Sequence, residues 1–170
     1  SEHEEFDIRW PFEEDIDRIL YCKSYQRYTD KTQALSFFQS AHISKRSIHV
    51  QWVSRIARQI GKGLNLNLDL IEAAALGHDL GHAPFGHQGE EVIKKITKEE
   101  IGQDFWHEKN GLYFVDKVEL LADNYNDYKN LDLTYAVRDG IISHCGEVDE
   151  NGTKPRTVFI SLEPVRCRLH

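Results

Sequence analysis

One stretch of the sequence interrupts a helical pattern with polar and turn-forming residues: Ala75-Leu-Gly-His-Asp-Leu-Gly-His-Ala-Pro-Phe-Gly-His-Gln-Gly-Glu90. Its glycines and its proline require the chain to turn, which exposes the polar side chains between them. His78 and Asp79 are adjacent, so a neutral nitrogen ligand lies beside a hard oxygen ligand. A divalent metal that also holds a phosphate needs this combination. The stretch therefore predicts a metal site and favours a metal-dependent phosphohydrolase.

Apolar residues elsewhere follow helical spacing, so we expect a mostly α fold. The predicted helices cover residues 13–28, 48–64, 70–77, 88–99, 107–123 and 131–143. Asp69 is expected to cap the third of these helices. In the second, an apolar stripe is expected to face the core, made of Trp52, Val53, Ile56, Ala57 and Ile60. Residues 146–155 are expected to form a loop and 157–162 a short strand near the C-terminal end.

His49 opens the stripe-bearing helix, and the pair His78-Asp79 ends the next one. If these two helices pack antiparallel, the start of one meets the end of the other, and the three side chains converge. Taken alone, His49 is better explained as a surface histidine at a helix start. An acid at a helix C-terminus opposes the helix dipole, so Asp79 is better explained by a site that requires it. Together the three residues are predicted to hold the metal.

His82, His87 and Glu90 follow on the glycine-rich stretch. Histidine is the side chain best suited to proton transfer near neutral pH, and Glu90 could orient His87 or hold a water. The alternative is a solvated loop anchored by Pro84 and Phe85. We interpret His87 and Glu90 as proton-transfer residues, and His82 as a third candidate.

Three further residues carry weaker local signals. His107, in Trp106-His107-Glu108, stands at an expected helix start, where an exposed histidine is equally common. Arg46 is the cation nearest to His49 and could clamp a phosphate with two hydrogen bonds, although a solvated arginine fits as well. Gln33 offers the donor and acceptor that sugar hydroxyls require, but by itself it indicates nothing.

Composition limits the remaining possibilities. The chain has 170 residues, 40% hydrophobic content and a formal net charge of −7, which suits one globular domain and argues against stable binding to duplex nucleic acid. No apolar run approaches the roughly 18 residues of a membrane span, and the acidic N-terminus is unlike a signal peptide. Three dispersed cysteines fit a reducing, cytoplasmic setting.

The ordered set His49 and His78-Asp79 resembles the HD-domain superfamily of metal-dependent phosphohydrolases, and more closely its deoxyguanosinetriphosphate triphosphohydrolase-like (dGTPase-like) branch. The resemblance covers roughly residues 15–145, and its most specific part is Glu72 to Glu90. The supporting segments are Asp17-Arg-Ile-Leu, Ser24-Tyr-Gln-Arg27, Lys31-Thr-Gln33, Lys45-Arg-Ser-Ile-His49 and Phe105-Trp-His-Glu108. It implies a helical core that binds a metal.

The resemblance also implies a role for each candidate. Metal ligands would be His49, His78 and Asp79, and the reacting phosphate would be lined by His82, His87, Glu90 and His107. Arg46 would contact phosphate and Gln33 the deoxyribose. The implied reaction is hydrolysis of a deoxynucleoside triphosphate (dNTP) to a deoxynucleoside and tripolyphosphate, a hydrolase activity on triphosphoric monoesters. The resemblance further implies assembly as a homo-oligomer. The mixed ligand set favours Mn, with Mg, Ni, Fe, Co or Zn as alternatives.

One departure from the family concerns the downstream aspartate that completes its metal site. Nothing after Glu147 matches that segment, whereas Asp116, Asp123, Asp132 and Asp139 precede the place where it should lie. We therefore expect an HD-type domain over residues 1–145 and the start of a truncated segment over 146–170. The alternatives are another HD-type phosphohydrolase, acting on a monophosphate, a cyclic nucleotide or a guanosine polyphosphate, and a nucleotide-binding fragment without turnover.

Overall fold

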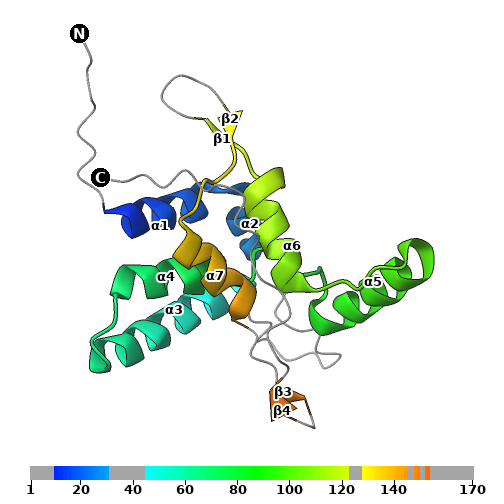
Figure 1. Cartoon of the computed structure of the whole chain (residues 1–170), viewed down its shortest axis with the longest axis horizontal. Helices are drawn as coiled ribbons and strands as arrows, with labels where there is room; N and C mark the ends of the chain where they lie inside the picture. The colour runs from blue at the N-terminus through cyan, green and yellow to red at the C-terminus, as the bar shows by residue number, and fades with distance from the viewer. Residues whose placement is uncertain (1–9, 31–44, 123–127, 145–147, 150–151, 154–170) are drawn as a thin grey trace.

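The computed structural model describes residues 10–30, 45–122, 128–144, 148–149 and 152–153, and these form a mostly α protein (Figure 1). The elements are α1 (Pro11–Tyr21), α2 (Lys23–Gln26), η1 (Arg27–Thr29), α3 (Arg46–Gly63), α4 (Leu68–Gly77), α5 (Gly86–Ile101), α6 (His107–Tyr113), η2 (Phe114–Val118), β1 (Leu121–Ala122), β2 (Tyr128–Lys129), α7 (Tyr135–Ser143), β3 (Val148–Asp149) and β4 (Gly152–Thr153). The strands pair antiparallel, β1 with β2 and β3 with β4. Within these described ranges, every helix is too short or too polar to span a bilayer.

Helices α3 and α4 lie side by side and run antiparallel, which is the condition under which His49 was expected to meet His78 and Asp79 (Figure 1). The turn between them ends at Asn67, whose side-chain oxygen accepts hydrogen bonds from the backbone N–H groups of Asp69 and Leu70 at 3.0 and 2.9 Å. The cap predicted at Asp69 is therefore wrong by two residues, since α4 begins at Leu68. This packing brings the first turn of α3 against the last turn of α4.

The apolar stripe of α3 mostly faces outward, contrary to prediction. Three of its five residues are more than half exposed: Trp52 (64%), Ile56 (57%) and Ile60 (59%). The residues that α3 buries are Arg46, Val50, Ser54 and Gly61. Two of these residues, Ser54 and Gly61, are small, and α4 approaches closely at Gly61, where a Cβ would lie 2.2 Å from Ile71 Cδ1. Helical spacing shows which residues share a face, but it does not show which face meets the neighbouring helix.

The single helix predicted over residues 13–28 is divided in two. Cys22 has an extended backbone, which ends α1 and starts α2. The buried carboxylate of Glu119 accepts hydrogen bonds from the backbone N–H groups of Lys23 and Ser24 at 3.0 and 2.8 Å. These are N–H groups that a new helix start leaves without a helical partner. A residue about 95 positions away therefore stabilises the break, which local spacing could not indicate.

Two other predicted helices have different bounds in the structure. The helix expected over 107–123 ends as α6 at Tyr113 and continues only as the π-helical turn η2. The helix expected over 131–143 begins at Tyr135, because Asp132 has a left-handed backbone with φ of 46°. Asp15 then accepts a hydrogen bond from the backbone N–H of Thr134 at 3.0 Å, at the start of α7.

The predicted helix over residues 88–99 is confirmed and is longer, since α5 spans Gly86–Ile101. It follows a tight turn in which Phe85 and Gly86 both have positive φ, 66° and 63°. The loop predicted over 146–155 contains the short strands β3 and β4. The strand predicted over 157–162 lies outside the described residues.

Glycines allow the elements around the His78-Asp79 pair to approach one another. A Cβ on Gly77 in α4 would lie 2.8 Å from the side chain of Ile141 in α7, and one on Gly140 would lie 2.8 Å from Ala74 Cβ. In the following loop, a Cβ on Gly81 would lie 2.0 Å from the backbone nitrogen of Gly111 in α6. These contacts place the ends of α4 and α7 and the start of α6 around one point.

We predict that Gly81→Ala destabilises the fold. The added methyl group would meet the backbone of α6, which cannot move away as a flexible side chain can, so unfolding should require about 1–3 kcal/mol less free energy. Urea unfolding followed by circular dichroism measures this difference.

The matched control is Gly63→Ala at the end of α3, where an added Cβ has no neighbour within 4 Å among the described residues. That change should be neutral or stabilising by up to about 1 kcal/mol. Equal stability of the Gly81→Ala variant and the wild type would show that the approach of α6 to this loop is looser than described.

Candidate metal and phosphate site

Three side chains predicted to hold a metal lie together where α3 begins and α4 ends. His49 is in the first turn of α3, His78 follows the last residue of α4, and Asp79 is next. One ligand atom from each lies within 4.8 Å of the other two. The rings of His49 and His78 are 5.8 Å apart, centroid to centroid. Two imidazoles and one carboxylate at this spacing fit a divalent transition metal.

Hydrogen bonding orients His78 for such a role. Its Nδ1 lies 2.7 Å from the carbonyl oxygen of Ala75, and a carbonyl only accepts, so Nδ1 carries the hydrogen. The lone pair is then on Nε2, which lies 3.5 Å from Asp79 Oδ2. Burial lowers the pKa of His78, which keeps the ring neutral. A neutral ring with its second nitrogen fixed by a backbone carbonyl is the usual form of a metal-binding histidine.

Asp79 forms a buried ion pair with Arg46. Nη1 of Arg46 contacts Oδ2 of Asp79, and the two residues are 2% and 4% exposed. Burial opposes a charged carboxylate, but the electrostatic interactions of Asp79 with His78, Arg46 and His82, together with its hydrogen bond with Arg46, outweigh burial and lower the pKa of Asp79. Nε of Arg46 is buried and has no hydrogen-bond partner among the described residues. The predicted phosphate-binding arginine thus lies beside the predicted metal ligands and retains an unused donor.

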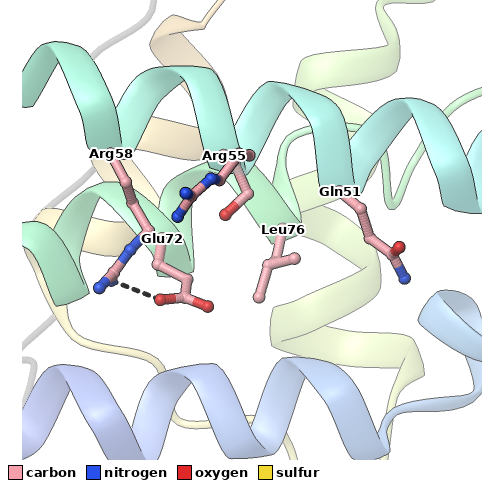
Figure 2. Close-up of a pocket in the computed structure, with 6 residues that line it drawn as sticks. Gln51, Arg55, Arg58, Glu72 and Leu76 are labelled. Atoms are coloured by element: carbon pink, nitrogen blue, oxygen red, sulfur yellow. Dashed lines mark hydrogen bonds and ion pairs between the residues drawn. The ribbon is translucent and has the colours of Figure 1, made fainter.

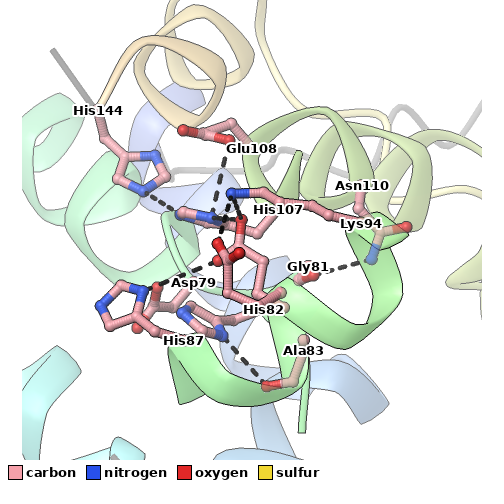
Figure 3. A network of polar contacts seen from close by, with 12 residues as sticks. Asp79, Gly81, His82, Ala83, His87, Lys94, His107, Glu108, Asn110 and His144 are labelled. Atoms are coloured by element: carbon pink, nitrogen blue, oxygen red, sulfur yellow. Dashed lines mark hydrogen bonds and ion pairs between the residues drawn. The ribbon is translucent and has the colours of Figure 1, made fainter. Parts of the chain in front are cut away.

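The proton-transfer candidates form a second group next to the first (Figure 3). Ligand atoms of Asp79, His82 and His107 lie within 4.8 Å of one another, as do those of His82, His87 and Glu90. The rings of His82 and His107 are 4.8 Å apart. All four candidates therefore lie next to the metal-ligand group, and Asp79 belongs to both groups.

Glu90 has a different main partner from the one expected. Its Oε1 accepts a hydrogen bond from Nδ1 of His107 at 3.2 Å, and Nζ of Lys94 lies 3.3 Å from the same oxygen. His87 is farther, with Nδ1 3.9 Å from Oε2, and its side chain is 89% exposed. Burial alone would raise the pKa of Glu90, but the hydrogen bond and charge of His107, together with Lys94, lower it. Glu90 therefore orients His107 more directly than His87.

Sequence reasoning missed three residues of this group. Glu108 lies 3.7 Å from Nδ1 of His107, and Lys94 is one helical turn after Glu90. His144, at the end of α7, places its Nε2 3.4 Å from Nε2 of His107. The only available signal for His144 was that a predicted helix ended one residue before it. Gln33, the predicted sugar-binding residue, lies outside the described residues.

Four aspartates were considered as a further metal ligand. Those that the structure describes do not lie with the trio. Asp116 pairs with Arg138 at 2.6 Å, and Asp132 is exposed with Arg18 3.9 Å away. Asp139 is absent from the possible metal clusters of the described residues, and Asp123 lies outside them. Among the described residues, Asp116, Asp132 and Asp139 therefore supply no fourth carboxylate to the trio.

A separate hollow of about 260 Å³ lies farther along α3 and α4 (Figure 2). Its lining residues are Gln51, Ser54, Arg55, Arg58, Glu72 and Leu76. Within it, Arg58 pairs with Glu72 at 2.5 Å and donates to the carbonyl oxygen of Leu68 at 3.1 Å. No predicted site residue lines this hollow, so it is distinct from the histidine-rich group.

Comparison with known proteins agrees with this geometry. The HD domain family matches residues 46–159. A protein of Caldanaerobacter subterraneus subsp. tengcongensis is 43% identical over 157 residues, which cover 92% of this chain and 42% of that protein. A protein of Desulfatibacillum aliphaticivorans is 42% identical over 137 residues, covering 81% of this chain and 36% of that protein.

A protein of Clostridium tetani is 41% identical over 140 residues, covering 82% of this chain and 37% of that protein. All three carry the name deoxyguanosinetriphosphate triphosphohydrolase-like protein. This chain thus spans about two fifths of the length of these relatives. The family match covers the trio, the glycine-rich stretch and His107, and the chain belongs to the HD domain family.

Proposed function

We propose that this chain carries the metal-binding and phosphate-binding part of a dNTP triphosphohydrolase, which hydrolyses a dNTP to a deoxynucleoside and tripolyphosphate. The observation that carries the proposal is the convergence of His49, His78 and Asp79 with a buried arginine and three further histidines. Relatives named dGTPase-like support the choice of substrate class. Mn²⁺ is the cofactor we favour, because the ligands mix imidazole and carboxylate.

The trio fits a divalent metal because the tautomer of His78 presents Nε2 toward Asp79. Burial raises the pKa of the Asp79 carboxyl, but the interactions with His78, Arg46 and His82 lower it overall, which favours the charged form that binds a metal. When bound there, the metal would withdraw charge from the phosphorus that is attacked. Arg46 would add positive charge on the phosphate side, since its unpaired Nε provides a donor next to the trio. The two positive groups would then meet the substrate phosphates from neighbouring positions.

The histidines would divide the proton transfers. His87 is exposed, so its ring can exchange a proton with an attacking water. His107 and His82 are buried and are the candidates to protonate the leaving 5′-oxygen. Burial and the charge of Arg46 lower the pKa of His82, so near neutral pH this ring carries no extra proton that it could give. We therefore assign the proton donation to His107, which Glu90 holds by its opposite nitrogen.

Several expectations from the sequence accompany this proposal. They are the domain division at residue 145, assembly as a homo-oligomer and a cytoplasmic location. Gln33 remains the predicted contact to the deoxyribose. Each of these expectations concerns the whole protein. The relatives are more than twice as long as the region that matches this chain.

The proposed reaction predicts a specific pair of products. Natural protein incubated with each of the four dNTPs and MnCl₂ should release deoxynucleoside and tripolyphosphate in equal amounts, measured by ion-exchange chromatography. The His78→Ala variant should release neither, because it lacks a metal ligand. Orthophosphate or pyrophosphate as the first product would instead indicate another HD-type phosphohydrolase, and calorimetric binding without any product would indicate a nucleotide-binding module.

From the Arg46–Asp79 pair we predict that the free energy of unfolding depends on whether Mn²⁺ is present. Arg46→Gln leaves a buried carboxylate without its cation, so in EDTA the free energy of unfolding should fall by about 3–5 kcal/mol. MnCl₂ should stabilise this variant more than the wild type, because a cation on Asp79 replaces the lost charge. Urea unfolding with and without MnCl₂ measures both effects.

Arg58→Gln is the matched control, since it removes another arginine–carboxylate pair between α3 and α4, about one third exposed. It should cost at most about 1 kcal/mol and should leave the response to MnCl₂ unchanged. If Arg46→Gln lowered the free energy of unfolding no more than Arg58→Gln does, the buried Arg46–Asp79 pair would not stabilise the fold as proposed.

A further inference from the structure

A second set of metal-type ligands surrounds the turn that leads into α5. Ligand atoms of His82, His87 and Glu90 all lie within 4.8 Å of one another. None of these three residues belongs to the trio that is predicted to hold the first metal. Two imidazoles and one glutamate are the protein ligands of several catalytic zinc sites, in which a water or the substrate takes the fourth position.

The chain folds back on itself to bring the second set together. His82 lies in the loop after α4, whereas His87 and Glu90 lie three residues apart in the first turn of α5 and share one side of that helix. A Cβ on Gly89 would lie 1.8 Å from the carbonyl oxygen of Pro84, so glycine is needed for α5 to pack onto this loop. The rings of His82 and His87 are 5.8 Å apart, centroid to centroid, and Figure 3 shows them side by side.

The hydrogen bonds of the second set identify the atoms that could bind a metal. Nδ1 of His82 lies 3.1 Å from the carbonyl oxygen of Ala83, so Nδ1 carries the hydrogen and the lone pair is on Nε2. Oε1 of Glu90 contacts His107, whereas Oε2 lies 3.9 Å from Nδ1 of His87. Ligand atoms at roughly 2.0–2.1 Å from a tetrahedral zinc lie about 3.4 Å apart. A small movement of the exposed His87 ring would therefore complete the site.

We propose that His82, His87 and Glu90 form a second metal site, which takes Zn²⁺ and thereby inhibits hydrolysis. Nitrogen and oxygen ligands bind Zn²⁺ more tightly than Mn²⁺, and this site needs the tighter ion because His107 and Lys94 already contact its carboxylate. The inhibition rests on the proposed function, in which His87 accepts a proton from the attacking water. A zinc ion on this ring would occupy the lone pair that accepts the proton.

Zinc binding to variants of the natural protein tests the site. After dialysis against a small excess of ZnCl₂, the wild type should hold two Zn²⁺ per chain, measured by atomic absorption. His87→Ala should hold one, since His87 belongs to the second set alone, and it should fold normally because this side chain is 89% exposed. His49→Ala should also hold one, and the double variant none. His3→Ala, outside the described residues, is the control for zinc bound elsewhere and should hold two.

The pattern of zinc loss separates this proposal from the proposed function. One zinc in the wild type that His87→Ala retains and His49→Ala loses would overturn the second site while leaving the trio. One zinc that only His87→Ala loses would support the second site and contradict the trio. Loss of the second zinc in His107→Ala but not in His87→Ala would also overturn the proposal, because Asp79, His82 and His107 would then hold it.

The inhibition is measured on protein that already holds Mn²⁺. One further equivalent of ZnCl₂ should lower the rate of dNTP hydrolysis at least about tenfold, within the range that general acid–base catalysis contributes, while the Mn²⁺ per chain stays constant. Release of Mn²⁺ in proportion to the lost activity would overturn the inhibitory role, since zinc would then act at the trio. A second bound zinc that leaves the rate unchanged would overturn it as well.

Discussion

The carboxylate of Asp79 is the group around which the site is organised. It is almost fully buried where the end of α4 meets the start of α3, and a buried charge is costly unless opposite charge and hydrogen bonds compensate it. Arg46 supplies that charge from α3, and His78 supplies an adjacent imidazole from the end of α4. The same oxygen of Asp79 faces both residues. A metal held by the trio and a phosphate held by Arg46 would therefore lie side by side.

Close helix packing makes this arrangement possible. Small residues occupy the faces where α4 meets α3 and α7, and glycines at 77, 81 and 140 lie where a side chain would collide with a neighbouring element. The helix ends consequently converge, and each end contributes a polar residue. His49 comes from a helix start, His78 and His144 from helix ends, and His107 from the first residue of α6. The first residues of helices and the residues that follow helix ends thus carry most of the described part of the candidate site.

Sequence reasoning predicted the group of His49, His78 and Asp79 because an acid at a helix end has no other simple explanation. It failed for the exposed stripe of α3, where Trp52, Ile56 and Ile60 share a face that does not meet α4. Periodicity gives the relative positions of side chains on one helix, and only the neighbouring element decides which face is buried. His144 was missed for the same reason, since its place beside His78 depends on how α7 packs against α4.

The partner of Glu90 shows a second limit. Spacing of three residues suggested that Glu90 orients His87, but α6 brings His107 closer, and Glu90 bonds to that ring instead. A local pair in the sequence can lose to a residue from another helix when both compete for one carboxylate. Most of the candidate side chains that the structure brings together could therefore be named from the sequence. Their hydrogen-bond pattern required the packing of α5, α6 and α7.

Crystallography with anomalous scattering tests the central claim most directly. Crystals of the protein grown with MnCl₂ should show an anomalous peak about 2.0–2.3 Å from an imidazole nitrogen of His49, from Nε2 of His78 and from a carboxylate oxygen of Asp79. A peak bound by other residues, or no peak while Arg46 alone contacts Asp79, would contradict the account.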